Sequence, residues 1–374
     1  MQKKMKYIHI KLACAATGFL LMVPAMGQLE SAGGKMPRNV ILMIGDGLGL
    51  SQLSSAYYFQ EDTTKYREPS FSRFSYIGLA KTSSGDELVT QSPAAATALA
   101  TGHKTYNLAV GVDLDTVPRE NIVELLSKQG YMTGVIATSH ITDATPAGFY
   151  AHQPDRYMQR EIAEDLLTSE VDFFAGGGLK VFIDTSGRDV FKENNIQVEF
   201  GRLKKIKKPE PGKRYGFLLA PDQMPPMLNG RKDFLEKATS IAVDFLSTGK
   251  AGFFLMVEGS QIDWAGHGNN VRYMISEVND FEKTVGRVLD YADKDGETLV
   301  IVTADHETGG YTLGAAGQNG YGADYSIITP TFASTNHSAA LVPVLAYGPG
   351  AENFIGIYEN TEIFHKLVSL LISE

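Results

Sequence analysis

Acidic residues follow three apolar runs of the sequence. The runs end shortly before Asp46, Glu258 and Asp305, and His306 comes directly after the last of these acids. A single acid after an apolar run is most often a capping or turn residue. Ligands of parallel α/β sheets, however, bind beyond the carboxyl ends of the strands. If the three runs are neighbouring parallel strands, the three acids meet at one site.

Another acid and two histidines stand in settings that suit the same site. Asp263 and His267 are four residues apart, so one helical turn would place both on the same side. His337 comes shortly before a further apolar run. Carboxylates with imidazoles are the usual donors to catalytic zinc, whereas carboxylates with hydroxyls and water suit magnesium. These donor types predict a metal centre.

Charge balance favours the same interpretation. Four ionised carboxylates gathered at one point, those of Asp46, Glu258, Asp263 and Asp305, would repel one another and raise one another's pKa values. Two zinc ions and one magnesium ion would more than cancel that negative charge. The surplus positive charge suits a dianionic ligand such as a phosphate monoester.

The segment around Ser92 has two interpretations. Ser92 is followed by Pro93 and by an alanine-rich stretch that predicts a helix. As a structural residue, Ser92 would cap that helix, with proline at the first helical position. As a nucleophile, it would present its hydroxyl at the amino end of the helix, where the dipole favours an alkoxide and a phosphate. The segment alone favours the cap.

The elements that must position these residues follow an alternating pattern. Apolar runs alternate with amphipathic segments, which predicts an α/β domain with a largely parallel sheet. The expected strands are Asn39–Ile44, Thr133–Ala137, Phe253–Val257, Leu299–Thr303 and Leu341–Ala346. The expected helices are Pro93–Ala100, Glu120–Lys128, Gln159–Leu167, Lys232–Leu246, Tyr273–Ala292 and Glu362–Ile372.

Residues 180–231 are less regular, and we expect a loop or an insertion there. The segment contains a run of basic residues between Arg202 and Arg214 that is interrupted by prolines. One interpretation is a patch that attracts anions. A solvated surface is favoured, because no aromatic residues interleave with the charges for stacking.

The first 27 residues differ in character from the rest. They hold four lysines, no acid and a short apolar run that ends in small residues. This pattern predicts a secretory signal rather than an uncleaved membrane anchor. Cleavage would remove Cys14, the only cysteine, and leave residues 28–374 as a single domain without disulfides. We expect an exported protein, periplasmic or secreted, with no membrane segment after cleavage.

Length and charge limit the partners. The chain has 374 residues, which is enough for a sizeable core, and a net charge of -9. An acidic protein is poorly suited to holding nucleic acid by its phosphates. We therefore expect a small-molecule substrate and no primary role in nucleic-acid binding.

In their order and combination, the motifs resemble those of the alkaline phosphatases. The resemblance runs from about Asn39 to the C-terminal helix and is carried by Gly45–Gly47, Ser92–Thr97, Asp143–Pro146, Glu258–Ser260, Asp263–His267, Thr303–Gly310 and His337. It implies a three-layer α/β/α sandwich around a largely parallel, mixed central sheet. It also implies hydrolysis of small phosphate monoesters through a phosphoserine, with two Zn2+ and one Mg2+ per subunit.

The resemblance further implies a role for each matching residue. Ser92 matches the nucleophile, and Arg156 matches the arginine that clamps the phosphate. The implied ligands are Asp263, His267 and His337 for the first zinc, Asp46, Asp305 and His306 for the second, and Asp46, Thr145 and Glu258 for magnesium.

The sequence departs from the family pattern at several points. Gln91 stands where an acid usually precedes the serine and orients the arginine, so we expect a more mobile Arg156 and weaker retention of phosphate. Trp264 takes a position near the metals that is Lys or His in other members. Only about thirty residues separate His306 from His337, so the insert that helps to form the family's dimer is reduced or absent. For the oligomeric state, the sequence is compatible with a homodimer and with a monomer.

Two other function classes are open as alternatives. The first is a phosphodiesterase or a phosphomutase of the same two-metal superfamily, although the implied magnesium ligands Thr145 and Glu258 favour monoesters. The second is an exported metal- or phosphate-binding protein with a decayed site, which only Gln91 suggests. A sulfatase is excluded. It would require a Cys or Ser in a motif like Ser-x-Pro-x-Arg, whereas alanines follow Ser92 and Pro93 here.

Overall fold

Ten strands form one mixed sheet in the residues that this computed structural model describes, 35–60, 67–183, 189–317 and 322–372. Their order is β14-β2-β13-β8-β1-β7-β3-β4-β6-β5. The strands are β1 (Asn39–Gly45), β2 (Tyr76–Lys81), β3 (Met132–His140), β4 (Phe173–Gly177), β5 (Ile196–Phe200), β6 (Arg214–Leu218), β7 (Phe253–Gly259), β8 (Thr298–Thr303), β13 (Val342–Tyr347) and β14 (Gly356–Glu359). Only β13 runs antiparallel to its neighbours within this sheet, so the prediction of a largely parallel, mixed sheet is confirmed.

The strands that end in acids are neighbours. β1 lies between β7 and β8, and all three run parallel. Ile44 of β1 pairs with Glu258 of β7 and with Thr303 of β8. Every residue of these strands is buried, which explains their continuous apolar runs, because strands covered on both faces have no solvent side. The carboxyl ends of the three strands therefore meet, as predicted.

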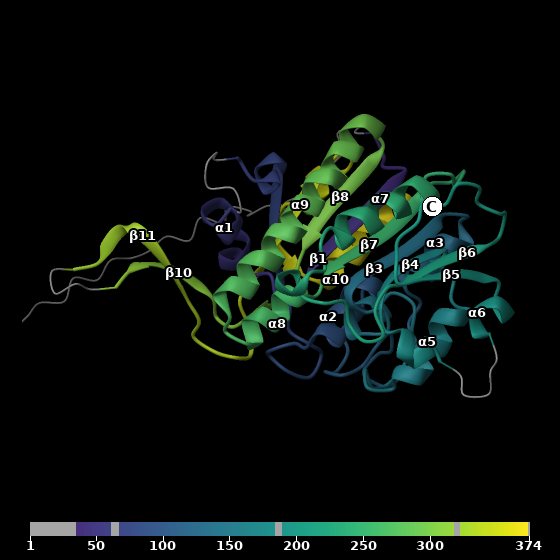
Figure 1. Cartoon of the computed structure of the whole chain (residues 1–374), viewed down its shortest axis with the longest axis horizontal. Coiled ribbons are helices and arrows are strands. Elements are labelled where there is room, and N and C mark those ends of the chain that lie inside the picture. The colour runs from purple at the N-terminus through teal and green to yellow at the C-terminus, as the bar shows by residue number, and fades with distance from the viewer. Residues whose placement is uncertain (1–34, 61–66, 184–188, 318–321, 373–374) are drawn as a thin grey trace, which may run out of the picture. The chain divides into compact units, whose positions relative to one another are not determined.

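Helices flank the sheet, as the three-layer sandwich requires (Figure 1). α7 and α9 pack side by side against β1, β3, β7 and β8, while α2, α3, α4 and α10 form a second group that contacts β3. The helices are α1 (Leu50–Tyr58), α2 (Ser92–Thr101), α3 (Ile122–Lys128), α4 (Ala144–Ala147), α5 (Gln159–Thr168), α6 (Val190–Glu193), α7 (Phe234–Leu246), α8 (Gln261–His267), α9 (Val271–Asp295) and α10 (Thr361–Leu371). All the expected helices and strands are present, with ends that differ by at most three residues.

The irregular segment 180–231 contributes two strands to the sheet. β6 pairs with β4, and β5 pairs with β6 at the sheet edge. β5 is short and only its first residue, Ile196, is buried, so its sequence lacks a strong strand pattern. Lys204, in the basic run, forms an ion pair of 2.5 Å with Glu199 of β5. This contact fits the interpretation of the basic run as a solvated surface.

Two ribbons lie between β8 and β13. β9 (Glu307–Thr308) pairs with β12 (His337–Ser338), and β10 (Thr312–Ala316) pairs with β11 (Asp324–Thr331), both antiparallel. The β10–β11 hairpin is the main feature described between His306 and His337, where we expected a reduced insert. The β9–β12 pairing sets His337 opposite Thr308, so the chain returns to the carboxyl end of β8.

The predicted signal, residues 1–27, lies outside the described residues, and the sheet belongs to the unit Lys35–Glu374. In the described ranges, no helix combines the length and the apolar character needed to cross a bilayer.

Candidate active site

The turns after β1 and β8 are locked together. Asp305 Oδ1 accepts hydrogen bonds from the N–H of Gly47 at 3.1 Å and from the N–H of His306 at 2.9 Å. Gly47 has a φ of +74°, and a Cβ added there would lie 2.9 Å from the Cα of Asp263. The turn therefore requires glycine, both for its left-handed backbone and for its close approach to α8. As a result, Asp46 and Asp305 are held near each other.

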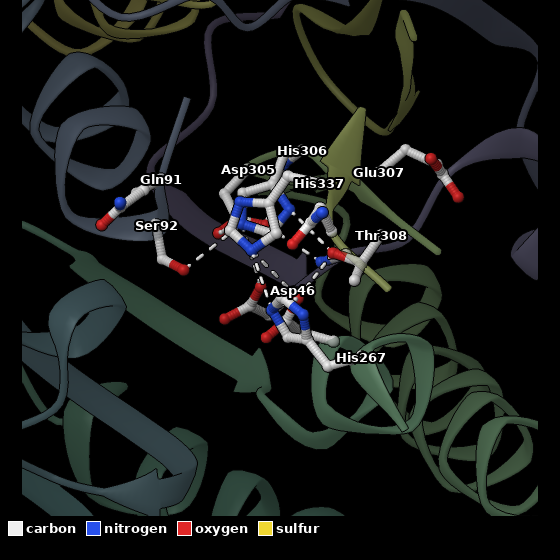
Figure 2. Close-up of polar contacts among 12 residues, drawn as sticks. Asp46, Gln91, Ser92, His267, Asp305, His306, Glu307, Thr308 and His337 are labelled. Carbon is white, nitrogen blue, oxygen red and sulfur yellow. Dashed lines mark hydrogen bonds and ion pairs between the residues drawn. The ribbon is translucent and has the colours of Figure 1, made fainter. Parts of the chain in front are cut away.

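Asp46, Asp305 and His306 form a buried cluster (Figure 2). His306 Nε2 lies 3.1 Å from Asp305 Oδ2 and 3.5 Å from Asp46 Oδ1. The Thr308 hydroxyl donates to Asp263 Oδ1, so its oxygen accepts from His306 Nδ1 at 3.1 Å. The proton of a neutral His306 then resides on Nδ1, and its Nε2 lone pair faces two carboxylates. Three electron-pair donors that converge in this way fit a cation.

Asp263, His267 and His337 form a second cluster. Asp263 Oδ1 lies 3.3 Å from His267 Nε2 and 3.4 Å from His337 Nε2, and the two Nε2 atoms are 3.1 Å apart. Each Nδ1 lies within hydrogen-bonding distance of a backbone carbonyl, that of Thr335 for His267 and that of Thr90 for His337. Carbonyls only accept, so each Nδ1 carries a proton, and in a neutral ring the Nε2 lone pair would be offered to a cation. This is the usual way in which a protein fixes histidine ligands of a metal.

A third group of oxygen atoms lies alongside the first cluster. Asp46 Oδ1, Thr145 Oγ1, Glu258 Oε2 and Asp305 Oδ2 are buried polar atoms without a hydrogen-bond partner among the described residues. A buried oxygen that lacks a partner costs roughly 1–3 kcal/mol, and more when it is charged. Carboxylate and hydroxyl oxygens suit a hard cation such as magnesium. All the metal-ligand candidates from the sequence therefore lie at one site, in an arrangement that fits cations.

The local charge imbalance shows in the pKa values. Burial, and then the nearby Asp143, raise the pKa of Glu258 to about 8. Burial and Asp305 hold the pKa of Asp46 well above its usual value. The hydrogen bond with Asp263 raises the pKa of His267 to about 9. Asp46 and Glu258 thus favour a proton or a cation over a bare carboxylate.

Ser92 is the first residue of α2, and its Oγ lies 3.3 Å from His306 Nε2 (Figure 2). Gln91 occupies the cap position with an extended backbone, and no side chain caps the helix. The interpretation of Ser92 as the cap, favoured by the segment alone, is therefore wrong. Because the helix begins one residue earlier than a Ser92 cap would require, the hydroxyl faces the first cluster. All ten residues of α2 are buried, since alanines allow close packing.

Arg156 enters the site from the loop before α5. Its Nη2 donates to Asp143 Oδ1 at 2.7 Å, and its backbone N–H donates to the carbonyl of Leu108 at 2.9 Å. The Gln91 side chain makes no hydrogen bond in the described part of the chain. We expected Gln91 to leave Arg156 more mobile, but the guanidinium is paired with Asp143. Sequence reasoning gave Asp143 no role, although it precedes Thr145 in one of the motifs.

The candidate residues surround a cavity of about 240 Å³. Ser92, Arg156, Asp46, His267 and His337 are among its lining residues. A larger hollow, about 1170 Å³, runs along α9, but it is lined by surface charges such as those of Lys237 and Asp290 rather than by the carboxylate–histidine clusters. The smaller cavity is therefore the place where chemistry is expected.

Comparison with known proteins agrees with this geometry. The family model for alkaline phosphatase matches residues 37–329. The chain belongs to the alkaline phosphatase family. Alkaline phosphatase 3 of Bacillus subtilis is 33% identical over 89% of this chain and 89% of its own length.

Solved alkaline phosphatases share the fold. The alkaline phosphatase from the Antarctic bacterium TAB5 is 50% identical, with a TM-score of 0.86 over 90% of this chain and 98% of its own. A mutant of the TAB5 enzyme, also 50% identical, holds magnesium in its M3 site and has a TM-score of 0.85 over 90% of this chain and 99% of its own.

Proposed function

We propose that the chain hydrolyses phosphate monoesters to an alcohol and inorganic phosphate, with Ser92 as the nucleophile. The observation that carries this proposal is the position of Ser92 Oγ, 3.3 Å from His306 Nε2 at the amino end of α2. The hydroxyl lines the same cavity as Arg156, the second carboxylate–histidine cluster and Asp46 of the first. A nucleophile, an anion clamp and two cation-binding clusters are the parts that phosphoryl transfer requires.

The donor sets support two zinc ions and one magnesium ion. Asp263, His267 and His337 would hold the first zinc; Asp46, Asp305 and His306 the second; and Asp46, Thr145 and Glu258 the magnesium. When bound, these ions lower the pKa of coordinated hydroxyl groups and neutralise charge on the attacking and leaving oxygens. The converging lone pairs and partnerless oxygens described above support this assignment.

Ser92 carries the covalent step. Its hydroxyl loses its proton to solvent as Oγ attacks phosphorus, the bond from phosphorus to the ester oxygen breaks, and the alkoxide that leaves on the opposite side takes up a proton from solvent to give the alcohol. The amino end of α2 favours the negative charge on Ser92 and on the phosphoryl oxygens. Water then attacks the phosphoserine, the bond between phosphorus and Oγ breaks, and Ser92 regains its proton as inorganic phosphate is released.

Arg156 holds the phosphoryl group during both steps. A guanidinium can pair with two phosphate oxygens at once, which fixes orientation as well as charge. The ion pair with Asp143 at 2.7 Å keeps the guanidinium at the cavity. We propose that Arg156 thereby orients the ester for attack by Ser92.

A comparison of a phosphate monoester with a matched diester tests this function. The purified protein is assayed at alkaline pH as isolated, after chelation, and after zinc and magnesium are restored. We expect monoester turnover that chelation abolishes, that metals restore, and that Ser92→Ala eliminates while the control Ser54→Ala on α1 retains it. Preference for the diester would assign the chain to phosphodiesterases. Binding of phosphate without any turnover would favour a binding protein.

We further propose that residues 1–27 direct export and are then removed. The amino-terminal pattern of the sequence supports this proposal. Mass determination of the exported protein tests it, with Gln28 expected as the first residue. Light scattering of the same sample decides between the homodimer and the monomer.

A further inference from the structure

Two aromatic residues line the cavity without a part in the steps above. Trp264 belongs to α8, and Tyr157 follows Arg156 directly in the chain. Both line the cavity of about 240 Å³ that holds Ser92 and Arg156. Since the phosphoryl group engages Ser92 and Arg156, the aromatic walls face the remainder of a bound ester.

The space does not end at Trp264. A second hollow of about 140 Å³ is lined by His140, Asp143, Gln223 and Trp264. Asp143 and Trp264 line both hollows, so the two adjoin. His140 Nε2 lies 3.2 Å from Gln223 Oε1, and the Gln223 oxygen accepts that hydrogen bond. The Gln223 amide N–H groups are left for another acceptor.

Neither aromatic side chain is held by a hydrogen bond or a ring contact among the described residues. Trp264 is half-buried, and among the described residues its indole makes neither a hydrogen bond nor a ring contact. Tyr157 is 74% exposed, and its phenol makes no hydrogen bond there. The backbones, by contrast, are fixed, because the N–H of Tyr157 donates to Asp155 Oδ1 at 2.9 Å and the carbonyl of Trp264 accepts from Gly268. Two free rings on a fixed backbone are prepared for a planar partner.

We propose that Trp264 and Tyr157 form a binding site for the leaving alcohol, selective for monoesters whose alcohol carries a planar aromatic ring. The inference rests on the proposed function, because it assigns the substrate class of the same cavity. The faces of indole and phenol rings stack on any flat aromatic ring, whatever substituents that ring carries. The hollow beside Gln223 gives such a ring a polar edge to contact.

Adenosine 5′-monophosphate and ribose 5-phosphate are a matched pair of substrates, because both release a primary ribose hydroxyl and only the first carries a base. We expect wild type to favour the adenosine ester by about tenfold in kcat/KM. Trp264→Leu should bring the ratio of the two kcat/KM values close to one, whereas Trp264→Phe should retain most of the preference for the adenosine ester. The control Tyr325→Ala, on the exposed hairpin, should leave the ratio unchanged. Phenyl phosphate serves as a third substrate, to show whether a ring attached directly to the ester oxygen also responds to Trp264→Leu.

The outcomes separate this inference from the proposed function. Equal kcat/KM values for the pair in wild type, or a preference that survives Trp264→Leu, would overturn the inference and leave the phosphatase function standing. Absence of turnover with every monoester would reject the phosphatase function and the inference together.

A binding measurement gives an independent readout. Trp264 is the only tryptophan of the chain, so the tryptophan fluorescence of the metal-loaded Ser92→Ala protein reports on this wall of the cavity alone. Saturating adenosine monophosphate should quench the emission, whereas ribose 5-phosphate and inorganic phosphate, with binding verified by calorimetry, should change it much less. Equal changes with all three ligands would contradict stacking on Trp264.

Discussion

Arg156 donates from Nη2 to Asp143 Oδ1 at 2.7 Å, so the arginine at the candidate phosphate site is paired with an acid that precedes α4. The residue that precedes Ser92 is the neutral Gln91. With the neutral Gln91 before Ser92, the guanidinium still has a carboxylate partner in Asp143.

Asp143→Asn should weaken substrate binding more than it slows turnover. A charge-assisted hydrogen bond contributes roughly 1.5–3 kcal/mol, so we expect KM to rise about tenfold or more with a smaller fall in kcat. Steady-state kinetics and the inhibition constant of inorganic phosphate measure the effect, with zinc and magnesium content determined in parallel. Unchanged KM and phosphate inhibition at full metal content would remove Asp143 from this role.

Metal removal should destabilise the fold as well as abolish activity. Without cations, the buried oxygens of Asp46, Glu258 and Asp305 lack partners and crowd like charges together. A ligand present at a thousand times its dissociation constant stabilises a protein by about 4 kcal/mol, so chelation should lower Tm by several degrees. Calorimetry with and without chelator measures the shift.

Glu258→Gln is the matched variant for that experiment. At pH 9, above the pKa of about 8 that Glu258 has in the metal-free site, it removes one negative charge, so the variant should bind less magnesium yet have a higher Tm than wild type once both are free of metal. A lower Tm for the metal-free variant would show that the crowded carboxylates do not destabilise the metal-free fold.

Gly47→Ala should disrupt the site because of a steric clash. The added Cβ would lie 2.9 Å from both the Asp263 backbone and Thr308 Oγ1, in addition to the strain of a φ of +74°. Gly230→Ala is the control, since Gly230 has a φ of +90° and open space around it. We expect the control to lose about 1 kcal/mol of stability from strain alone. Gly47→Ala should lose more stability, and zinc binding with it. Equal losses for the two variants would contradict the close approach to α8.

His152 should make stability depend on pH. Its Nδ1 faces the carbonyl of Gly111 at 2.7 Å and its Nε2 faces Glu124 Oε1 at 2.9 Å, so both ring nitrogens face acceptors. Burial lowers the pKa of His152, but the contacts with Glu124 and Gly111 raise it on balance above 6.5. A raised histidine pKa gives stability that is complete below pH 6.5 and is lost as the pH rises through the pKa of the folded state.

His152→Gln tests that dependence. The difference in Tm between wild type and variant should be largest below pH 6.5, of the order of 2 °C, and should shrink toward pH 9. A difference that stays constant over this range would mean that His152 is not charged in the folded protein.

The sequence allowed the central strands and the meeting of the metal-ligand candidates to be predicted for identifiable reasons. β1, β7 and β8 are buried on both faces, so their apolar runs are uninterrupted, and the acids at their ends stand out. The spacing of Asp263 and His267 on α8 marks one helical face. Edge strand β5, in which only Ile196 is buried, carries no such pattern and was not predicted.

Tertiary contacts account for what the sequence did not indicate. Ser92 looks like a helix cap until the fold sets His306 beside it, 214 residues further along the chain. The pairing of Asp143 with Arg156 depends on how the loop before α5 returns past α4, which no local motif encodes. The adjoining hollows at Trp264 likewise arise from residues that are distant in sequence.

Capture of a phosphoserine tests the central claim most directly. The metal-loaded protein is incubated with a phosphate monoester, quenched in acid and digested, and the peptide that contains Ser92 is examined by mass spectrometry. We predict a gain of one phosphoryl group on Ser92, absent from Ser92→Ala, which should also lack turnover. Undiminished turnover in Ser92→Ala, or a phosphoryl group on another residue, would contradict the account.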